Sequence, residues 1–205
     1  MSLGKMGWVL GLASILLISC NSTDVCDFTV IVNDLNQPDG SDSIDFHDVA
    51  PNAKIAQSFR PATSFILANI SFTIKKVENP QATLRVSIHE KDNNENRPED
   101  DPITDGGPVI VDLSEISDNF FTEVKAVFPD EPDLDSGRDY YFVINSVEDL
   151  DEENYFQLGS VSTDTAYPDG EVWHFNSDVT DEDEAWDDST EDLQFRIEKC
   201  EEDEN

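Results

Sequence analysis

Basic side chains are scarce in this sequence. Twelve lysines and arginines stand against 46 aspartates and glutamates, so the formal net charge at pH 7 is −34. Nucleic-acid binding depends on basic side chains that displace counterions from phosphates, and the field of this chain repels a polyanion. The shortage of basic groups therefore excludes nucleic acid as a direct partner and disfavours an anionic membrane surface.

The acidic excess also says something about the surroundings of the protein. Such a charge strains a compact fold by self-repulsion, whereas in molar salt the Debye length shrinks to about 3 Å and the repulsion is screened. We therefore expect a halophilic or marine source, with calcium-rich surroundings as the competing explanation. Intrinsic disorder is a third possibility, but the periodic apolar segments described below argue against it for most of the chain.

Catalytic motifs are absent as well. The three histidines, His47, His89 and His174, are far apart and do not follow a metal-ligand spacing such as HExxH. No GxSxG elbow, phosphate-binding loop or dinucleotide fingerprint occurs. With 46 acidic residues, no carboxylate pair for glycoside hydrolysis can be singled out. We expect a non-catalytic protein and keep a glycan-active enzyme as an alternative.

The apolar run near the start is too short to cross a membrane. It extends from Trp8 to Ile18 behind Lys5, and a spanning helix needs about 20 apolar residues. Leu17, Ile18 and the small Ser19 stand directly before Cys20, which is the arrangement of a lipobox. The sequence predicts a signal peptide over 1–19, lipidation of Cys20 and a tether over 20–25. The alternative is an ordinary signal peptide cut at another small residue, with Cys20 a free thiol.

Cysteine is rare too, and the total is three. If Cys20 carries lipid, Cys26 and Cys200 remain, one before the first apolar segment and one at the end of the last. Because an exported protein meets an oxidising compartment, we expect a disulfide between them, with two free thiols as the alternative. The predicted domain covers 26–200, and residues 201–205 form an acidic tail.

The apolar residues that are present recur with a period of two. In 66–74, 82–88 and 120–128 apolar and polar residues alternate, which predicts half-buried strands with one face in water. Further strands are expected at 28–33, 55–60, 109–113, 140–147, 155–161, 171–175 and 193–199. About ten strands with turn signals between them, and no amphipathic helix, predict an all-β fold, an antiparallel two-sheet β-sandwich of jelly-roll type. We expect contact between the first and last strands.

Two polar stretches are candidate calcium sites. Acidic and amide side chains crowd into 92–95 and 178–188, and calcium prefers such oxygen ligands. Neither stretch follows the EF-hand pattern, and a solvated acidic surface is the alternative. The candidate ligands are Asp92, Asn94, Asp181, Asp183 and Asp187.

Aromatic residues supply a second candidate site. Tyr141 lies on the strand face opposite Tyr140, Trp173 shares a face with Phe175, and Trp186 lies within an acidic stretch that we expect to be a loop. Aromatic side chains flanked by carboxylates and amides hold sugar rings by stacking and hydrogen bonding. Tyr141, Trp173 and Trp186 are therefore candidate carbohydrate-binding residues. The alternative is that these aromatics fill the core and cover its edges.

Several segments resemble a known family of surface domains. They are Ile55–Pro61, Lys75–Val77, Ala82–Ile88, an L-x-x-G-x-x-Y entry to a strand in Leu134–Tyr141, the turn Tyr167–Gly170 and the closing strand Leu193–Ile197. Over about residues 53 to 199 the chain resembles the choice-of-anchor R domain. The resemblance implies a secreted β-sandwich domain of bacterial and archaeal surface proteins without an established catalytic activity. An N-terminal lipid in place of a C-terminal sorting segment, and the acid load, depart from that pattern.

Together these features predict an exported lipoprotein of the outer membrane or cell surface. Asn21 follows Cys20 where an aspartate would favour inner-membrane retention in enteric bacteria. The expected role is a binding or adhesion module that contacts the membrane through Cys20 and takes a polysaccharide or another envelope protein as partner. A structural subunit of the envelope or of an extracellular fibre is the alternative.

Overall fold

The chain forms strands throughout the part that is described. The computed structural model describes residues 31–33, 43–46, 54–92, 95–147, 150, 153–161, 170–175, 186–189 and 191–200. Within these ranges no helix is long and apolar enough to cross a membrane. The strands are β1 (Ile31–Asn33), β2 (Ser43–Phe46), β3 (Lys54–Phe59), β4 (Phe65–Val77), β5 (Leu84–Glu90), β6 (Val109–Ile110), β7 (Thr122–Val127), β8 (Asp133–Leu134), β9 (Tyr140–Ser146), β10 (Tyr155–Val161), β11 (Val172–Phe175), β12 (Trp186–Ser189), β13 (Asp192–Leu193) and β14 (Phe195–Cys200).

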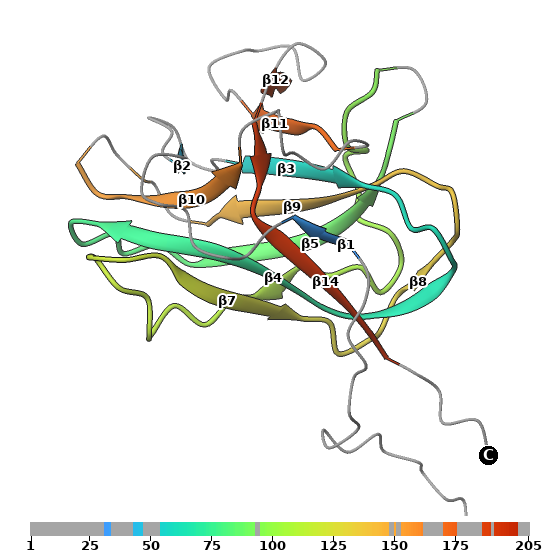
Figure 1. Ribbon diagram of the computed structural model, residues 1–205, viewed down its shortest axis with the longest axis horizontal. Helices are drawn as coiled ribbons and strands as arrows, with labels where there is room; N and C mark the ends of the chain where they lie inside the picture. Colours follow the sequence, from blue (N-terminus) through green and yellow to red (C-terminus); the bar gives the residue numbers. More distant parts are fainter. Residues whose placement is uncertain are drawn as a thin grey trace, which may run out of the picture.

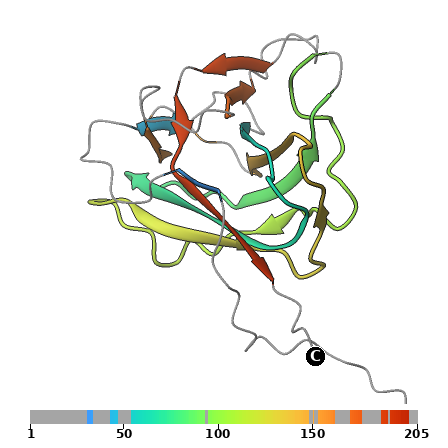
Figure 2. The ribbon, with the colours of Figure 1, turned by 45° about the vertical axis from the view of Figure 1, so that its right-hand side comes forward.

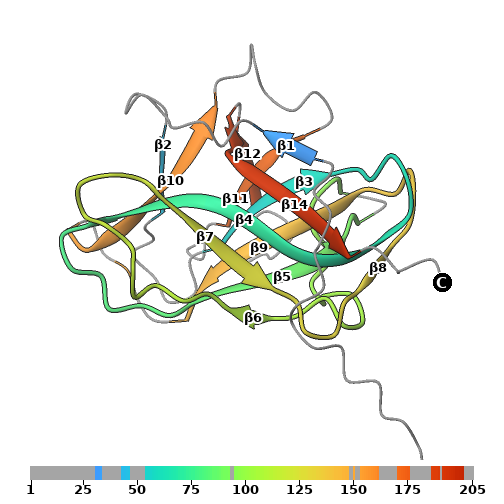
Figure 3. The ribbon, with the colours of Figure 1, turned by 60° about the horizontal axis from the view of Figure 1, so that its bottom comes forward.

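These strands make two antiparallel sheets, which lie against each other (Figures 1 and 3). The six-stranded sheet has the order β12-β11-β3-β9-β5-β6. The larger sheet follows β1-β14-β4-β10-β13, with β2 beside β10 and with β7 and β8 beside β4. The predicted all-β, two-sheet antiparallel β-sandwich is confirmed. Its jelly-roll type stays a prediction.

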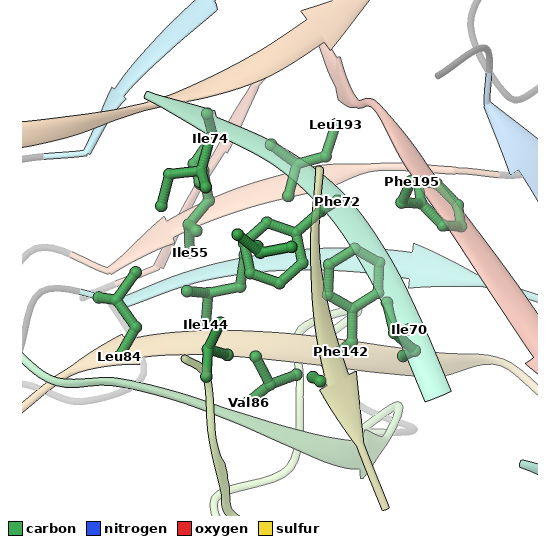
Figure 4. Close-up of a cluster of buried hydrophobic side chains, with 14 of the residues drawn as sticks. Ile55, Ile70, Phe72, Ile74, Leu84, Val86, Phe142, Ile144, Leu193 and Phe195 are labelled. Atoms are coloured by element: carbon green, nitrogen blue, oxygen red, sulfur yellow. The ribbon is translucent and has the colours of Figure 1, made fainter. Parts of the chain in front are cut away.

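The core fills the space between the sheets. Residues of strands in both sheets point inward, and the side chains labelled in Figure 4 come from both sheets. The ring centroids of Phe142 on β9 and Phe195 on β14 lie 5.2 Å apart, which joins the two layers directly. Large aromatic contacts of this kind contribute more than their buried area alone.

The long central strand β4 differs from its prediction, because its polar face is not in water. Asn69, Ser71 and Thr73 are buried to 6 %, 0 % and 5 % exposure. Asn69 Nδ2 donates to Glu198 Oε2 over 2.7 Å, and Thr73 Oγ1 donates to Gln194 Oε1 over 2.9 Å. Hydrogen bonds to the neighbouring strand β14 and the residue before it therefore replace water at Asn69 and Thr73, whereas the buried Ser71 hydroxyl has no hydrogen-bond partner among the described residues.

A β-bulge also changes which residues of β4 enter the core. Glu198 pairs with Asn69 but Lys199 pairs with Leu67, so Ala68 is the extra residue. One extra residue reverses the alternation, and Leu67 joins the main core where the sequence predicts Ile66 and Ala68. Phe120, predicted on the core face of its strand, precedes β7 and is 63 % exposed.

The first described strand lies beside the last. Ile31, Val32 and Asn33 of β1 pair with Ile197, Arg196 and Phe195 of β14, and Figure 2 shows the short blue strand next to the red one. The predicted contact between the first and last strands is therefore confirmed. Cys20 and Cys26 lie outside the described residues, and of Cys200 only the backbone at the end of β14 is described. Lipidation and the disulfide stay predictions.

Candidate functional site

A row of partly exposed side chains crosses the outer face of the six-stranded sheet. The strand register places Trp186 beside Phe175, Phe175 beside Lys54, Lys54 beside Asn145 and Asn145 beside Arg85. We call these five residues the cross-strand row. Neighbouring strands lie about 4.8 Å apart, so four steps carry the row over about 19 Å. It runs from two aromatic rings through a cation and an amide to a second cation.

The next row on the same face is more buried. Ala56 and Val143 are buried there, and Trp173 and Trp186 pack against them and Tyr141 as a small apolar cluster. This cluster supports the aromatic end of the cross-strand row from one side. Phe175 meets Trp186 edge-on with ring centroids 5.3 Å apart, so the two exposed aromatics hold each other in place.

All five residues of the cross-strand row line one cavity of about 330 Å³. That volume lies at the lower end of the range of about 300–1,000 Å³ for small-ligand sites. Strand residues Ser87, His89 and Val143 line it too, and Pro98, Glu99, Asp100 and Pro102 line it from the segment that follows β5. We call it the outer-face cavity.

The segment beside this cavity, residues 95–108, is firmly held to the sheet, and we call it the crossing segment. Backbone bonds run from Glu99 N to Glu90 O over 2.9 Å and from Ile103 N to Ile88 O over 2.9 Å. The Tyr141 hydroxyl donates to the carbonyl of Asn96. These contacts fix one wall of the cavity before any ligand arrives.

Arg97 gives the crossing segment an internal cation. Its side chain is 7 % exposed, with Nε 2.5 Å from Glu95 Oε2 and Nη1 3.0 Å from Asp100 Oδ1. Two carboxylates of this acidic segment are therefore neutralised from inside. Just before the segment, Asp92 Oδ1 accepts a hydrogen bond from the Glu95 amide over 3.2 Å.

Ser87 and His89 form a hydrogen-bonded pair at the cavity wall. His89 Nδ1 lies 2.7 Å from the Glu99 carbonyl, so this nitrogen donates, and Nε2 accepts from Ser87 Oγ over 2.8 Å. Burial lowers the pKa of His89 below its usual value, which keeps the ring neutral. A serine nucleophile also needs preorganised oxyanion donors, whereas the backbone of β5 pairs with β9 on one side and with β6 on the other. We assign the pair to anchoring the crossing segment.

The two cations of the cross-strand row lack carboxylate partners. Among the described residues, neither Lys54 nor Arg85 belongs to an ion pair. Lys54 Nζ lies 4.6 Å from the centroid of the Phe175 ring, a cation–π contact that orients it toward the aromatic end of the row.

The structure brings the three predicted aromatic residues together but exposes them differently from the prediction. Tyr141 is fully buried, and burial together with the nearby charge of Glu171 raises the pKa of its hydroxyl. Tyr141 therefore supports the site as part of the small apolar cluster, and its ring is not accessible to solvent. Trp173 and Trp186 are half-buried. The prediction that Trp186 lies in a loop is wrong, because it begins strand β12.

The calcium candidates are only partly visible. Asn94, Asp181 and Asp183 lie outside the described residues, while Asp92 follows β5 and Asp187 lies on β12. Within the described ranges no group of three or more His, Cys, Asp or Glu side chains could hold a metal ion. Calcium binding stays a prediction.

Sequence reasoning missed Lys54, Asn145 and Arg85. The alternation of β5 and β9 indicates that Arg85 and Asn145 face away from the core, but only the register across five strands shows that they share one row with Trp186. No protein-family model matches this chain, and no curated protein matches it.

Proposed function

We propose that this protein is an exported, lipid-anchored surface module that binds carbohydrate in its outer-face cavity. The cross-strand row is the observation that supports the proposal. Trp186 and Phe175 supply apolar ring faces and Asn145 an amide on a rigid sheet, which is the combination that holds a sugar by stacking and hydrogen bonding. The resemblance to the choice-of-anchor R domain agrees with a surface role.

The site is suited to binding more than to turnover. Its walls consist of paired strands and of the crossing segment, which is tied down by backbone bonds and by Arg97. A preformed cavity saves the ordering cost that a flexible loop has on binding. The Ser87–His89 pair is used in the same anchoring, so we include no catalytic step in the proposal.

Retention on immobilised polysaccharides tests this function. Trp186→Ala should reduce retention on the polysaccharide that the unchanged protein binds by about tenfold or more, since loss of one stacked aromatic removes a large share of the contact energy. Phe120→Ala is the matched control, because Phe120 is 63 % exposed and does not line the cavity. The melting temperature of both variants separates loss of binding from loss of fold.

Two results would contradict the proposal. One is that the unchanged protein is retained by no polysaccharide in a panel of neutral and acidic glycans. The other is retention that Trp186→Ala and Phe120→Ala leave equally intact, which would place binding elsewhere on the surface. Asn145→Ala tests the polar position in the middle of the cross-strand row. This variant should also weaken retention on the polysaccharide that the unchanged protein binds.

A further inference from the structure

The placement of basic residues on this acidic protein is selective. Most basic side chains of the described residues are neutralised by carboxylates of the same chain; those in ion pairs are Arg60, Lys91, Arg97, Lys125, Arg138 and Arg196. In the smaller polar hollow beside Tyr141, Arg60 and Lys91 both contact Asp139, over 2.5 Å and 3.8 Å. Four described basic residues belong to no ion pair: Lys75 and Lys76 lie on β4, whereas Lys54 and Arg85 both line the outer-face cavity.

Two unpaired cations in one cavity are unexpected in a chain with 46 acidic residues. They flank Asn145 in the cross-strand row, two inter-strand steps apart, which corresponds to about 10 Å. The acidic residues that share the cavity differ in their availability. Asp100 already pairs with Arg97. Glu99 is the other carboxylate that lines the cavity, and among the described residues it belongs to no ion pair.

We infer that the ligand of the outer-face cavity is an acidic sugar chain, in which one carboxylate or sulfate group binds Arg85, a second meets Lys54, and a ring stacks on Trp186. This inference rests on the proposed carbohydrate-binding function and names its substrate class. The planar guanidinium of Arg85 matches a carboxylate or sulfate with two parallel hydrogen bonds. Lys54 adds a point charge at the aromatic end, where the Phe175 ring holds it.

The net charge of the protein predicts how salt acts on this binding. At low ionic strength the field of the whole chain repels an acidic polysaccharide, as it repels nucleic acid. At about 1 M salt the Debye length is about 3 Å, so the distant carboxylates are screened, whereas a contact pair at the half-buried Lys54 is screened less. Binding of an acidic glycan should therefore strengthen between low and moderate salt, the reverse of ordinary ion-pair binding.

Matched pairs of polymers separate charge from sugar. Polygalacturonic acid and its methyl ester share a backbone and differ in the carboxylate, and dextran sulfate and dextran differ in the sulfate. Polyglutamate is a polyanion without sugar. We expect retention on one or both acidic glycans, at least about tenfold weaker binding to the neutral partner, and no retention on polyglutamate. Comparison of retention on polygalacturonic acid with retention on dextran sulfate decides whether the anionic group that binds is a carboxylate or a sulfate.

Charge variants then locate the contact. Arg85→Gln and Lys54→Met should each weaken binding of the acidic glycan about tenfold or more, and Arg85→Lys should fail to restore it because lysine lacks the planar fork. Lys76→Met is the matched control, because it removes a basic residue on β4 that does not line the cavity. Melting temperatures check that all four variants fold.

The outcomes separate this inference from the proposed function. Equal binding of neutral and acidic partners, weakened by Trp186→Ala but unchanged by Arg85→Gln, would overturn the acidic-sugar inference and leave carbohydrate binding standing. Retention on polyglutamate as strong as on the acidic glycans would overturn the requirement for a sugar. Failure to bind any glycan would overturn both.

Discussion

At the scale of single residues, Glu198 is a buried carboxylate enclosed by three hydrogen-bond partners. Its side chain is 3 % exposed and accepts hydrogen bonds from Asn69 Nδ2, Lys125 Nζ and Arg196 Nε over 2.7, 2.9 and 3.0 Å. Burial opposes ionisation of Glu198, but the bonds from Lys125 and Asn69 outweigh it and hold the pKa below its usual value. The ionised carboxylate therefore ties β14 to β4 and β7.

Replacing this carboxylate should cost stability. Glu198→Gln should lower the free energy of unfolding at pH 7 by about 1–3 kcal/mol. The buried glutamine accepts only neutral hydrogen bonds in place of the charged ones, and some of the bonds are lost. Since the folded pKa is depressed, the wild-type advantage is present above the unfolded pKa and is lost as pH falls through the folded value. Urea denaturation at pH 7 and at pH 3 measures both effects. Glu123→Gln, at an exposed pair with Arg196, should change stability by about 0.5 kcal/mol or less.

The buried His89 should make the protein sensitive to mild acid. Its pKa is lowered by burial and by the charge of Lys54, against the opposing influence of the Glu99 carbonyl, Asp101 and Asp100. Below about pH 6.5 the histidine of the unfolded chain becomes protonated, while the buried ring of the folded protein stays neutral. The free energy of unfolding therefore falls with decreasing pH down to the folded pKa. Melting temperatures between pH 5 and 8 should therefore drop more steeply toward acid for the wild type than for His89→Gln. Parallel curves would contradict the prediction.

At the scale of elements, the crossing segment depends on Arg97 for its shape. Lysine has the charge of arginine but not the fork that reaches Glu95 and Asp100 together. Arg97→Lys should therefore speed amide hydrogen exchange in residues 95–101 by about tenfold. Arg138→Lys, at a pair whose arginine is 57 % exposed, is the control and should leave exchange unchanged. Equal protection in both variants would show that backbone bonds alone hold the segment.

The elements also show how far the sequence could predict the fold. Strands β5 and β7 follow the period of two, and they and the further expected strands β3 and β9 are found at their predicted places within a few residues. Strand β12 was not predicted, because its residues Trp186, Asp187, Asp188 and Ser189 do not alternate clearly and pairing with β11 decides their conformation. The bulge in β4 was missed for the same reason, since it depends on the partner strand β14. For the candidate site, residue types indicated Trp173 and Trp186, but only register could add Lys54, Asn145 and Arg85.

At the scale of the whole molecule, the charge of −34 should make stability depend on salt. Carboxylates spread over a compact surface repel one another more in the folded than in the expanded chain, and added salt screens this repulsion. Between 0.1 and 2 M NaCl the melting temperature should rise by about 5 °C or more. Calorimetry at constant pH measures it, with sorbitol at equal osmolality as the control. A melting temperature that does not change with NaCl would show that the acid load carries no such penalty.

The pairing of β1 with β14 has a mechanical consequence for a protein that is pulled by its N-terminal end. Among the described strands β1 is the end strand of its sheet and pairs with β14 at three residues, whereas the core lies between the two sheets. Tension arriving through the chain before Ile31 is met first by this short strand. If Cys20 carries the predicted lipid anchor, we expect β1 to detach from β14 before the sandwich is loaded, and a ligand in the outer-face cavity to stay bound while the chain before β3 extends.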